Sequence, residues 1–451
     1  MGVCSTPARQ ATRGAIGLLL IVVAVLLLAP AALAADPVEP LWANVWSAKS
    51  PGEVTNAQVV RSAQSDIFTA CSVFRPSYST YDVIVAKYRP DGTRKWVRSW
   101  SRGTDINEMV TGVATDPDGN LIVVGWYDKG GQDDWFMLKY DRDGYLKWAK
   151  TTGGTAGSDD RAVDVAVNKY GRIFATGFVT QSTGGKNWRT VKYKPSGETV
   201  WARTYKGAAQ LDDEPTAMAI DAARNIYVTG FEGTDQNNHV RKDAVTLKYA
   251  PDGTAEWVLP FNMQYEETGV DIAVRKTGVV VAVKAVAEDP TFTSAYALKY
   301  SRDGEALMAA SLDYGSTVTD EYLCAGIDGL GRSVFGGFNV HESTGDSTAL
   351  LTQYNADAVS EWAFELTGSG NALGDQFNEM FVALGGNVWV TGSVAGAAVT
   401  RSFDAAGVER WNAVYDVASD FDSGQDMHVT SKSAYVVAHS GTSLVLIRYP
   451  R

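Results

Sequence analysis

The sequence predicts an all-β protein, an eight-bladed β-propeller whose blades are four-stranded antiparallel sheets. Three observations lead to this prediction. An eleven-residue stretch recurs about every fifty residues along the 451-residue chain, a strand–turn–strand stretch recurs between its copies, and half-repeats at the two chain ends complete each other. A period of this size is typical of propellers and solenoids, whose repeats bury a core only when they stack.

The eleven-residue stretch is predicted to form a tight hairpin. It is AKYRPDGTRKW at 86–96, LKYDRDGYLKW at 138–148 and VKYKPSGETVW at 191–201. Glycine occupies the turn in every copy but one, where Ala358 stands, because such turns need a positive φ. An aromatic residue precedes each turn, at Tyr88, Tyr140, Tyr193, Tyr249, Tyr300, Tyr354, Phe403 and Tyr449. A tryptophan follows eight positions later in most copies, at Trp96, Trp148, Trp201, Trp257, Trp362 and Trp411.

The second recurring stretch supplies the other half of each repeat. It reads GVATDPDGNLIVVG at 112–125, DVAVNKYGRIFATG at 164–177 and AMAIDAARNIYVTG at 217–230. Each copy is a strand, a tight turn and a second strand rich in valine, isoleucine and aromatic residues. One repeat therefore contains four strands in about fifty residues, without helical periodicity, which is the pattern of a propeller blade.

The two ends of the chain predict how the ring closes. The strand LWANVW at 41–46, which contains Trp42, has no tyrosine strand before it, and LVLIRY at 444–449 has no tryptophan strand after it. We expect the first strand to complete the last blade, which removes the exposed edges of an open array. Residues 35–451 are thus predicted to be a single propeller domain of eight repeats.

The first 34 residues are predicted to be a secretory signal peptide that is removed. Arg9 and Arg13 precede an apolar run, and Ala32 and Ala34 form a small-x-small cleavage site. An uncleaved membrane anchor is the alternative. The prediction places the protein outside the cytoplasm, as a secreted, periplasmic or cell-surface protein without a transmembrane segment after cleavage.

Charge and cysteine content narrow the classes of partner. The formal net charge is −12, which argues against nucleic acid, because an acidic surface repels phosphate. After signal cleavage only Cys71 and Cys324 remain, far apart in the repeat order, and we expect two separate buried thiols. A monomer is expected.

The repeat resembles a known family. The patterns D-x-x-G-N-x-Y-V-T-G and K-Y-x-x-x-G-x-x-x-W resemble the bacterial SBBP-type β-propeller repeat and, more loosely, the delta-60 repeat. Ala86, Gly92 and Trp96 are similar to the tryptophan-docking motif of eight-bladed quinoprotein-type propellers, with Tyr88 in place of that motif's acidic residue. The resemblance implies that each tryptophan packs against the next blade. The structural repeat residues would be Trp42, Trp96, Trp148, Trp201, Trp257, Trp362 and Trp411.

Aromatic residues outside the repeat positions suggest a ligand site. One face of the ring should carry only short turns, whereas the connections on the opposite face are longer and differ between blades, which favours function there. The long connections of blades 2 and 3 could bind a protein, peptide or glycan, and the alternative is that the rings cover blade edges. The candidate ligand-binding residues are Trp126, Tyr127, Asp133, Trp135, Asn187, Trp188 and Arg189.

A recurring acid gives a second candidate. Five blades carry a carboxylate near the start of the first strand, at Glu108, Asp160, Asp213, Glu267 and Asp320. They could form an acidic mouth that holds Ca²⁺ or a basic ligand. In the alternative, each acid accepts hydrogen bonds from backbone N–H groups. Apart from this Ca²⁺ possibility, no cofactor is expected.

These observations favour an exported, non-catalytic propeller that acts as a binding scaffold. The sequence contains no Gly-x-Ser-x-Gly elbow, His-Glu-x-x-His motif, P-loop or Rossmann fingerprint. A lyase or hydrolase that uses the acids at the mouth remains an alternative. A quinone-dependent dehydrogenase is a further one, although the chain lacks the adjacent cysteines that many of those enzymes carry.

Overall fold

The computed structural model describes residues 37–47, 54–128, 130–153, 158–181, 185–236, 239–287, 293–312, 318–341, 344–368, 374–416, 422–440 and 442–451. Within these ranges the chain forms 32 β-strands and no helix, so nothing there could cross a membrane as a helix. The predicted signal peptide, residues 1–34, lies outside the described residues.

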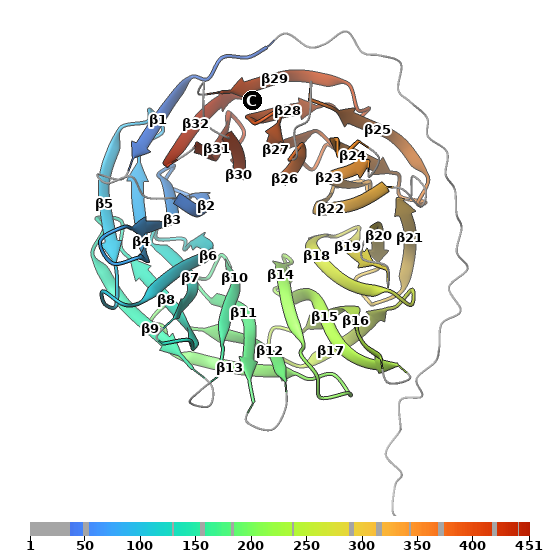
Figure 1. Cartoon of the computed structure of the whole chain (residues 1–451), viewed down its shortest axis with the longest axis horizontal. Coiled ribbons are helices and arrows are strands. Elements are labelled where there is room, and N and C mark those ends of the chain that lie inside the picture. The colour runs from blue at the N-terminus through green and yellow to red at the C-terminus, as the bar shows by residue number, and fades with distance from the viewer. Residues whose placement is uncertain are drawn as a thin grey trace, which may run out of the picture.

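The strands form eight blades arranged as a ring (Figure 1). Blades 1 to 4 contain β2 (Val54–Arg61), β3 (Ile67–Arg75), β4 (Thr80–Tyr88), β5 (Arg94–Trp100), β6 (Asn107–Thr115), β7 (Leu121–Asp128), β8 (Asp133–Tyr140), β9 (Leu146–Thr152), β10 (Arg161–Val167), β11 (Ile173–Thr180), β12 (Lys186–Tyr193), β13 (Thr199–Tyr205), β14 (Glu214–Ile220), β15 (Ile226–Gln236), β16 (His239–Tyr249) and β17 (Ala255–Phe261). Blades 5 to 8 contain β18 (Glu266–Arg275), β19 (Gly278–Val286), β20 (Thr293–Tyr300), β21 (Ala306–Leu312), β22 (Val318–Ile327), β23 (Ser333–His341), β24 (Ser347–Tyr354), β25 (Ser360–Leu366), β26 (Gln376–Val382), β27 (Val388–Val394), β28 (Ala397–Phe403), β29 (Glu409–Tyr415), β30 (Asp422–Val429), β31 (Ser433–Ser440), β32 (Ser443–Pro450) and β1 (Trp42–Ser47). The predicted fold class is confirmed.

The amino-terminal strand closes the ring, as predicted. β1 pairs antiparallel with β32, from Trp42 opposite Arg448 to Ser47 opposite Ser443. The last blade therefore has the order β1-β32-β31-β30, with β1 outermost (Figure 1). Just before β1, the Val38 N–H donates to the Asn412 carbonyl of blade 7 at 2.7 Å. The strands at the two ends of the chain therefore pair with each other in one blade.

The hydrophobic core lies between blades. The described residues form eight apolar clusters, and each combines side chains of two neighbouring blades. The middle strands are packed on both faces, which is why they read as continuous apolar runs such as LIVVG at 121–125. Cys71 and Cys324 are free, buried thiols in two different clusters, in agreement with the prediction.

The repeat tryptophans form an outer girdle. The Trp96 indole N–H donates to the Arg142 carbonyl of the next blade at 3.1 Å, and Trp201 does the same to Pro251 at 3.2 Å. Six of the seven rings, all but Trp411, also cover the turn glycine of the next blade: a Cβ at Gly144 would lie 2.8 Å from the Trp96 ring. The predicted packing of each tryptophan against its neighbour is confirmed. Ala358 adopts the left-handed conformation of the turn despite its methyl group, with φ at +68°.

A second set of polar links joins the blades near the axis of the ring. At each of the eight blade boundaries, a side chain of one blade bonds a backbone atom of the next. The Asp164 carboxylate, for example, accepts from the Met218 N–H at 3.0 Å, and the Thr111 hydroxyl donates to the Ala162 carbonyl at 3.0 Å. The side chains are Ser72, Thr111, Asp164, Thr216, Asp271, Cys324, Asn378 and Asp426.

Candidate functional site

The two faces of the ring differ in their connections. Within a blade, the first-to-second and third-to-fourth strand turns lie on one face, which we call the turn face; 116–120 and 141–145 are examples. The remaining connections lie on the opposite face, which we call the loop face. They range from the two-residue turn Ala395–Gly396 to the longer links between blades. The sequence-predicted ligand residues belong to this second face.

Two of the predicted ligand-binding aromatics are buried between blades. Trp135 on β8 and Trp188 on β12 are only 2% and 1% exposed. The Trp135 indole N–H donates to the Phe178 carbonyl, and that of Trp188 to the Phe231 carbonyl, both at 2.9 Å and both in the next blade. These rings fill blade boundaries, which corrects the expectation that they contribute to an exposed patch.

The other aromatics of this group are held by charged neighbours. The Tyr127 hydroxyl donates to Asp134 at 2.8 Å, and its ring lies 4.3 Å from the Arg102 guanidinium. Trp126 is half-buried, with the Arg161 guanidinium 4.3 Å from its ring. Cation–π contacts of this kind order the rings but leave part of the Trp126 surface accessible.

The polar members of the group also have partners. Asp133 is 5% exposed and forms an ion pair with Arg161 of the next blade at 2.5 Å. The Asn187 amide donates to the Gly185 carbonyl at 3.2 Å, and the half-buried Arg189 bonds the Thr204 hydroxyl at 3.4 Å. The structure thus brings Trp126 and Asp133 together around Arg161. Ligand binding by these residues stays a prediction.

The five recurring acids cap loops instead of forming an open mouth. All five side chains are fully buried. Asp213 accepts from the Gly207 and Gly233 N–H groups at 2.7 and 3.0 Å, and Glu267 accepts from Met263 and Tyr265 at 2.8 and 2.9 Å. Glu108 and Asp160 likewise accept backbone hydrogen bonds, from Arg102 and Thr180. The alternative expectation, that each acid satisfies backbone amides, describes these four residues.

Two further acids, which were not predicted from the sequence, belong to this set. Asp375 in blade 7 accepts from the Gly368 and Ala395 N–H groups, and Asp422 occupies the same position in blade 8. No group of three or more histidine, cysteine or acidic side chains among the described residues is arranged to hold a metal ion. The capping acids are spread over separate blades, so each acts on its own loop.

Four other acids surround the axis of the ring. Asp164, Asp271, Glu379 and Asp426 lie on the innermost strands of blades 3, 5, 7 and 8 and are half-buried. Burial raises the pKa of Asp164 to about 6 and that of Asp426 to about 7. Burial also raises the pKa of Asp271 and Glu379, and Glu379 is further affected by repulsion from the other three carboxylates. No repeat motif had indicated this group.

Because these acids have raised pKa values, we expect the fold to be more stable near pH 5 than near pH 8. Their folded pKa values lie above the ordinary values, 3.8 for aspartate and 4.5 for glutamate, as do those of the caps Glu108, about 7, and Asp213, about 6. The folded state therefore binds more protons than the unfolded state between these values, so the free energy of unfolding falls as pH rises through 6 to 7. Urea midpoints measured from pH 5 to 8 should decrease steadily.

Glu379→Gln is the matched variant for this prediction. It keeps an acceptor oxygen but removes the most strongly repelled charge, so it should raise stability at pH 8 and flatten the pH dependence. His428 acts in the opposite direction within this pH range: burial lowers its pKa to about 4, which costs stability as pH falls below 6.5. A urea midpoint that rises from pH 5 to 8 would show that the raised carboxyl pKa values are wrong.

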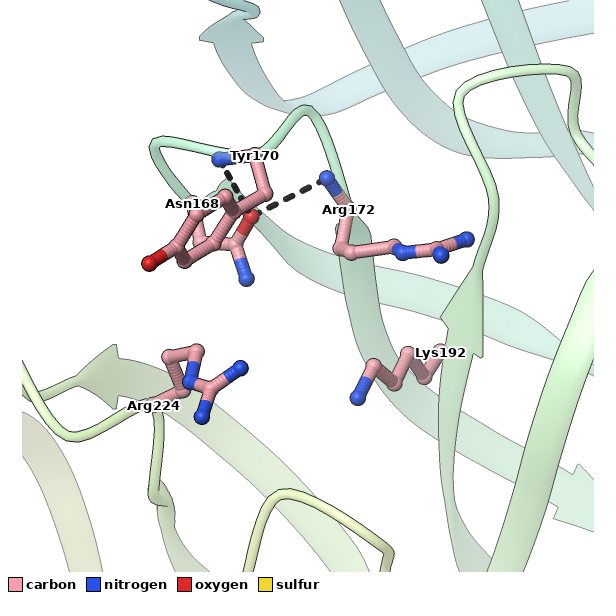
Figure 2. A pocket seen from close by; sticks show the side chains of 5 residues that line it. All are labelled: Asn168, Tyr170, Arg172, Lys192 and Arg224. Atoms are coloured by element: carbon pink, nitrogen blue, oxygen red, sulfur yellow. Dashed lines mark hydrogen bonds between the residues drawn. The ribbon is translucent and has the colours of Figure 1, made fainter.

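A hollow on the turn face was also missed. It has a volume of about 330 Å³ and lies between blades 3 and 4, lined by Asn168, Tyr170, Arg172, Lys192 and Arg224 (Figure 2). The sequence feature that accompanies this hollow is the turn NKYGR at 168–172 of blade 3. The equivalent turn of blade 2 is DPDGN at 116–120. The acid that begins the turn in blade 2 is an amide in blade 3.

One comparison with a solved structure agrees with the fold. A solved structure entitled "Structure of Dos1 propeller" matches with a TM-score of 0.54 and 9% identity, over 91% of this chain and 94% of that one. Two proteins of unknown function match with lower scores: one from Bacteroides caccae (TM-score 0.36, 12% identity, 64% of this chain and 93% of that one) and one from Dyadobacter fermentans (0.38, 11%, 73% and 98%).

Two further proteins are similar to this chain in sequence. The regulatory protein FlaEY of Caulobacter vibrioides is 24% identical over 357 residues, which are 67% of this chain and 37% of that protein. An uncharacterised WD repeat-containing protein of Acanthamoeba polyphaga mimivirus is 24% identical over 214 residues, 42% of this chain and 12% of that protein. The chain thus spans less than half the length of either relative. No family model matches the sequence.

Proposed function

We propose that this chain is an exported, non-catalytic propeller of the SBBP type that binds a protein, peptide or glycan. One observation carries the proposal: the recurring acids that could have served a catalytic or metal site are fully buried on backbone amides. General acid–base catalysis requires a group within hydrogen-bond reach of the substrate. The propeller fold, shared with the Dos1 propeller, is a rigid scaffold whose loops are free to carry a binding site.

Blade 4 offers the most extended surface on the loop face. β15 and β16 have eleven residues each, the longest strands of the ring, whereas β27 and β28 of blade 7 have seven. The outer part of this hairpin carries Val240, which is 66% exposed, beside the basic Arg241 and Lys242. An exposed apolar side chain flanked by cations suits a partner with an apolar and acidic surface. We therefore assign the partner contact to this hairpin.

Export is compatible with the way the ring is closed. The first contacts of the described chain are made by Pro37 and Val38 with Asn412 of blade 7. Cleavage after Ala34 would leave these contacts and the β1–β32 pairing intact. Removal of a signal peptide therefore requires no change in the ring.

One expression experiment tests both parts of the proposal. The full chain is expressed in a Gram-negative host, and we expect an extracytoplasmic product that begins at Ala35 by amino-terminal sequencing and sediments with isolated envelope. Val240→Glu should begin at the same residue but remain unbound, because the charge replaces the exposed apolar contact. Val258→Glu changes another exposed valine, on β17 of the same blade, and should still sediment.

The outcomes separate export from binding. Intact Met1 in the membrane pellet would support an uncleaved anchor and contradict export as proposed. Equal sedimentation of both variants would place the contact away from the hairpin. Release of a soluble product from the envelope by the purified protein would support the lyase or hydrolase alternative.

A further inference from the structure

The turn-face hollow carries an inference that is independent of the proposed loop-face function. Three cations meet there, in a protein whose net charge is −12. Arg172 is the residue just before β11, Lys192 lies on β12, and Arg224 lies in the turn before β15. Figure 2 shows the Arg172 and Lys192 side chains on one side of the hollow and Arg224 on the other, below Tyr170.

The repeat provides internal comparisons for Lys192. In three other blades the equivalent lysine forms an ion pair: Lys87 with Asp66 at 2.7 Å, Lys139 with Asp116 at 2.8 Å, and Lys248 with Glu256 at 2.6 Å. In blade 5 the equivalent Lys299 donates to the Gly331 and Ala356 carbonyls. All three of these ion-paired lysines also donate to a carbonyl of the next blade, and Lys192 keeps only that bond, to Pro251 at 2.6 Å, with no ion pair among the described residues. A carbonyl accepts a hydrogen bond but does not neutralise the charge.

The change from aspartate to asparagine explains the difference. In blade 2, one Asp116 oxygen accepts from the Asp118 and Asn120 N–H groups, and the other pairs with Lys139. In blade 3, the Asn168 oxygen makes the same turn by accepting from the Tyr170 and Arg172 N–H groups at 2.9 and 3.1 Å (Figure 2). Asn168 therefore preserves the turn while removing the counter-charge of the lysine.

The two arginines add to the excess positive charge. Arg224 adopts φ +75°, whereas the corresponding turn position of blades 2 and 3 is glycine, Gly119 and Gly171. The acid of its own turn, Asp221, is already paired with Arg302 at 2.6 Å. Burial lowers the pKa of Lys192, and the Arg172 and Arg224 guanidinium groups lower it further, while Asp252 opposes them.

We propose that this hollow binds a phosphate group. Two guanidinium groups and an ammonium from two adjacent blades suit a tetrahedral anion with two negative charges, because guanidinium groups bind phosphate oxygens in pairs and lysine adds a point charge. A carboxylate would need only one guanidinium group, which binds both of its oxygens. The Tyr170 ring, which is 59% exposed, lies at the rim and offers a surface for the organic part of a phosphate ester.

Asn168→Asp is the decisive variant. It restores the residue of blade 2 with the same turn geometry, so the new carboxylate should pair with Lys192 and compete with phosphate. Titration calorimetry with inorganic phosphate at constant ionic strength should show saturable binding to the wild type and binding weaker by at least about tenfold to the variant. Phosphate should raise the melting temperature of the wild type more than that of Asn168→Asp.

Two controls separate the site from net charge and from folding. Lys95→Gln removes one positive charge from an exposed position on β5 and should bind phosphate like the wild type. Arg224→Gly introduces the residue that other turns carry at positive φ, so it should fold at least as stably but bind more weakly. Equal phosphate affinity in the wild type and Asn168→Asp, or no saturable binding to the wild type, would overturn the proposal.

Further probes identify the source of the phosphate. Acetate at the same ionic strength should not compete, and competition equal to that of phosphate would overturn the assignment of ligand class. Glycerol 3-phosphate that binds as well as phosphate, without binding to phosphatidic acid vesicles, would indicate soluble or polymer-linked phosphate esters. Vesicle binding that Asn168→Asp abolishes would indicate a lipid headgroup as the source.

Discussion

Trp188→Ala should lower the free energy of unfolding by about 3–5 kcal/mol, as expected for removal of a large buried aromatic side chain. Its ring is 1% exposed and lies 5.2 Å from the Tyr205 ring, and its indole N–H bonds the next blade. The substitution would leave a cavity and an unpaired Phe231 carbonyl at the boundary of blades 3 and 4. Urea unfolding followed by tryptophan fluorescence and circular dichroism would measure the loss.

Trp126→Ala is the matched control for this prediction. Trp126 belongs to the same predicted ligand group, but its ring is half-buried under the Arg161 guanidinium. We expect a loss smaller than that of Trp188→Ala, on the order of 1 kcal/mol. Equal effects of the two substitutions would contradict the structural role of Trp188 and restore it as a candidate ligand residue.

Deletion of residues 37–47 should destabilise the ring more than any single tryptophan substitution, by over roughly 3–5 kcal/mol. The deletion removes β1, including Trp42, whose indole N–H donates to the Pro90 carbonyl of blade 1 at 3.0 Å. It also exposes the edge of β32, which can then pair with other chains. Thermal unfolding and light scattering should show a lower midpoint and concentration-dependent aggregation.

The control for ring closure is a chain that begins at residue 37. It lacks the predicted signal peptide but keeps the Val38 and β1 contacts, so its melting temperature should equal that of the mature protein. Addition of a peptide with residues 41–47 should partly restore the shorter chain, because β32 offers the same pairing edge. A chain without β1 that melts like the control would show that closure contributes little.

The fold could be predicted because the same sequence pattern recurs about every fifty residues. Each tryptophan strand and turn glycine recurs along the chain, and the two half-repeats at its ends matched in the way that β1 and β32 pair. Even the exception, Ala358, occurs at a turn position that the other copies defined. Many copies of one pattern average out the ambiguity of any single short strand.

The predicted ligand group was less secure because a sequence shows residue types but not where they point. Trp135 and Trp188 both stand five positions before the aromatic residue of their turns, Tyr140 and Tyr193. This shared position in adjacent blades was itself a sign of a repeated structural role. The acids followed the same logic: their recurrence matches a common capping task, and the structure shows the backbone partners of Glu108, Asp160, Asp213 and Glu267.

The turn-face hollow could not be recognised from composition or motifs. Its cations come from turns and strands of two blades, and their significance depends on a missing counter-charge at Asn168. An asparagine in a turn is unremarkable because it makes the same backbone bonds as aspartate. Only the pairing of Lys139 with Asp116 in the preceding blade reveals what Lys192 lacks.

The links between blades have a consequence for how this ring could have grown. Four tryptophans of the outer girdle, Trp42, Trp96, Trp201 and Trp257, donate to a backbone carbonyl of the next blade. The links near the axis likewise join a side chain of one blade to a backbone atom of the next, as in Asp164 to Met218. Backbone atoms are the same in every repeat, so a blade does not need a particular neighbour. A duplicated blade would find its contacts already present, and its loops and turns would be free to acquire new ligands.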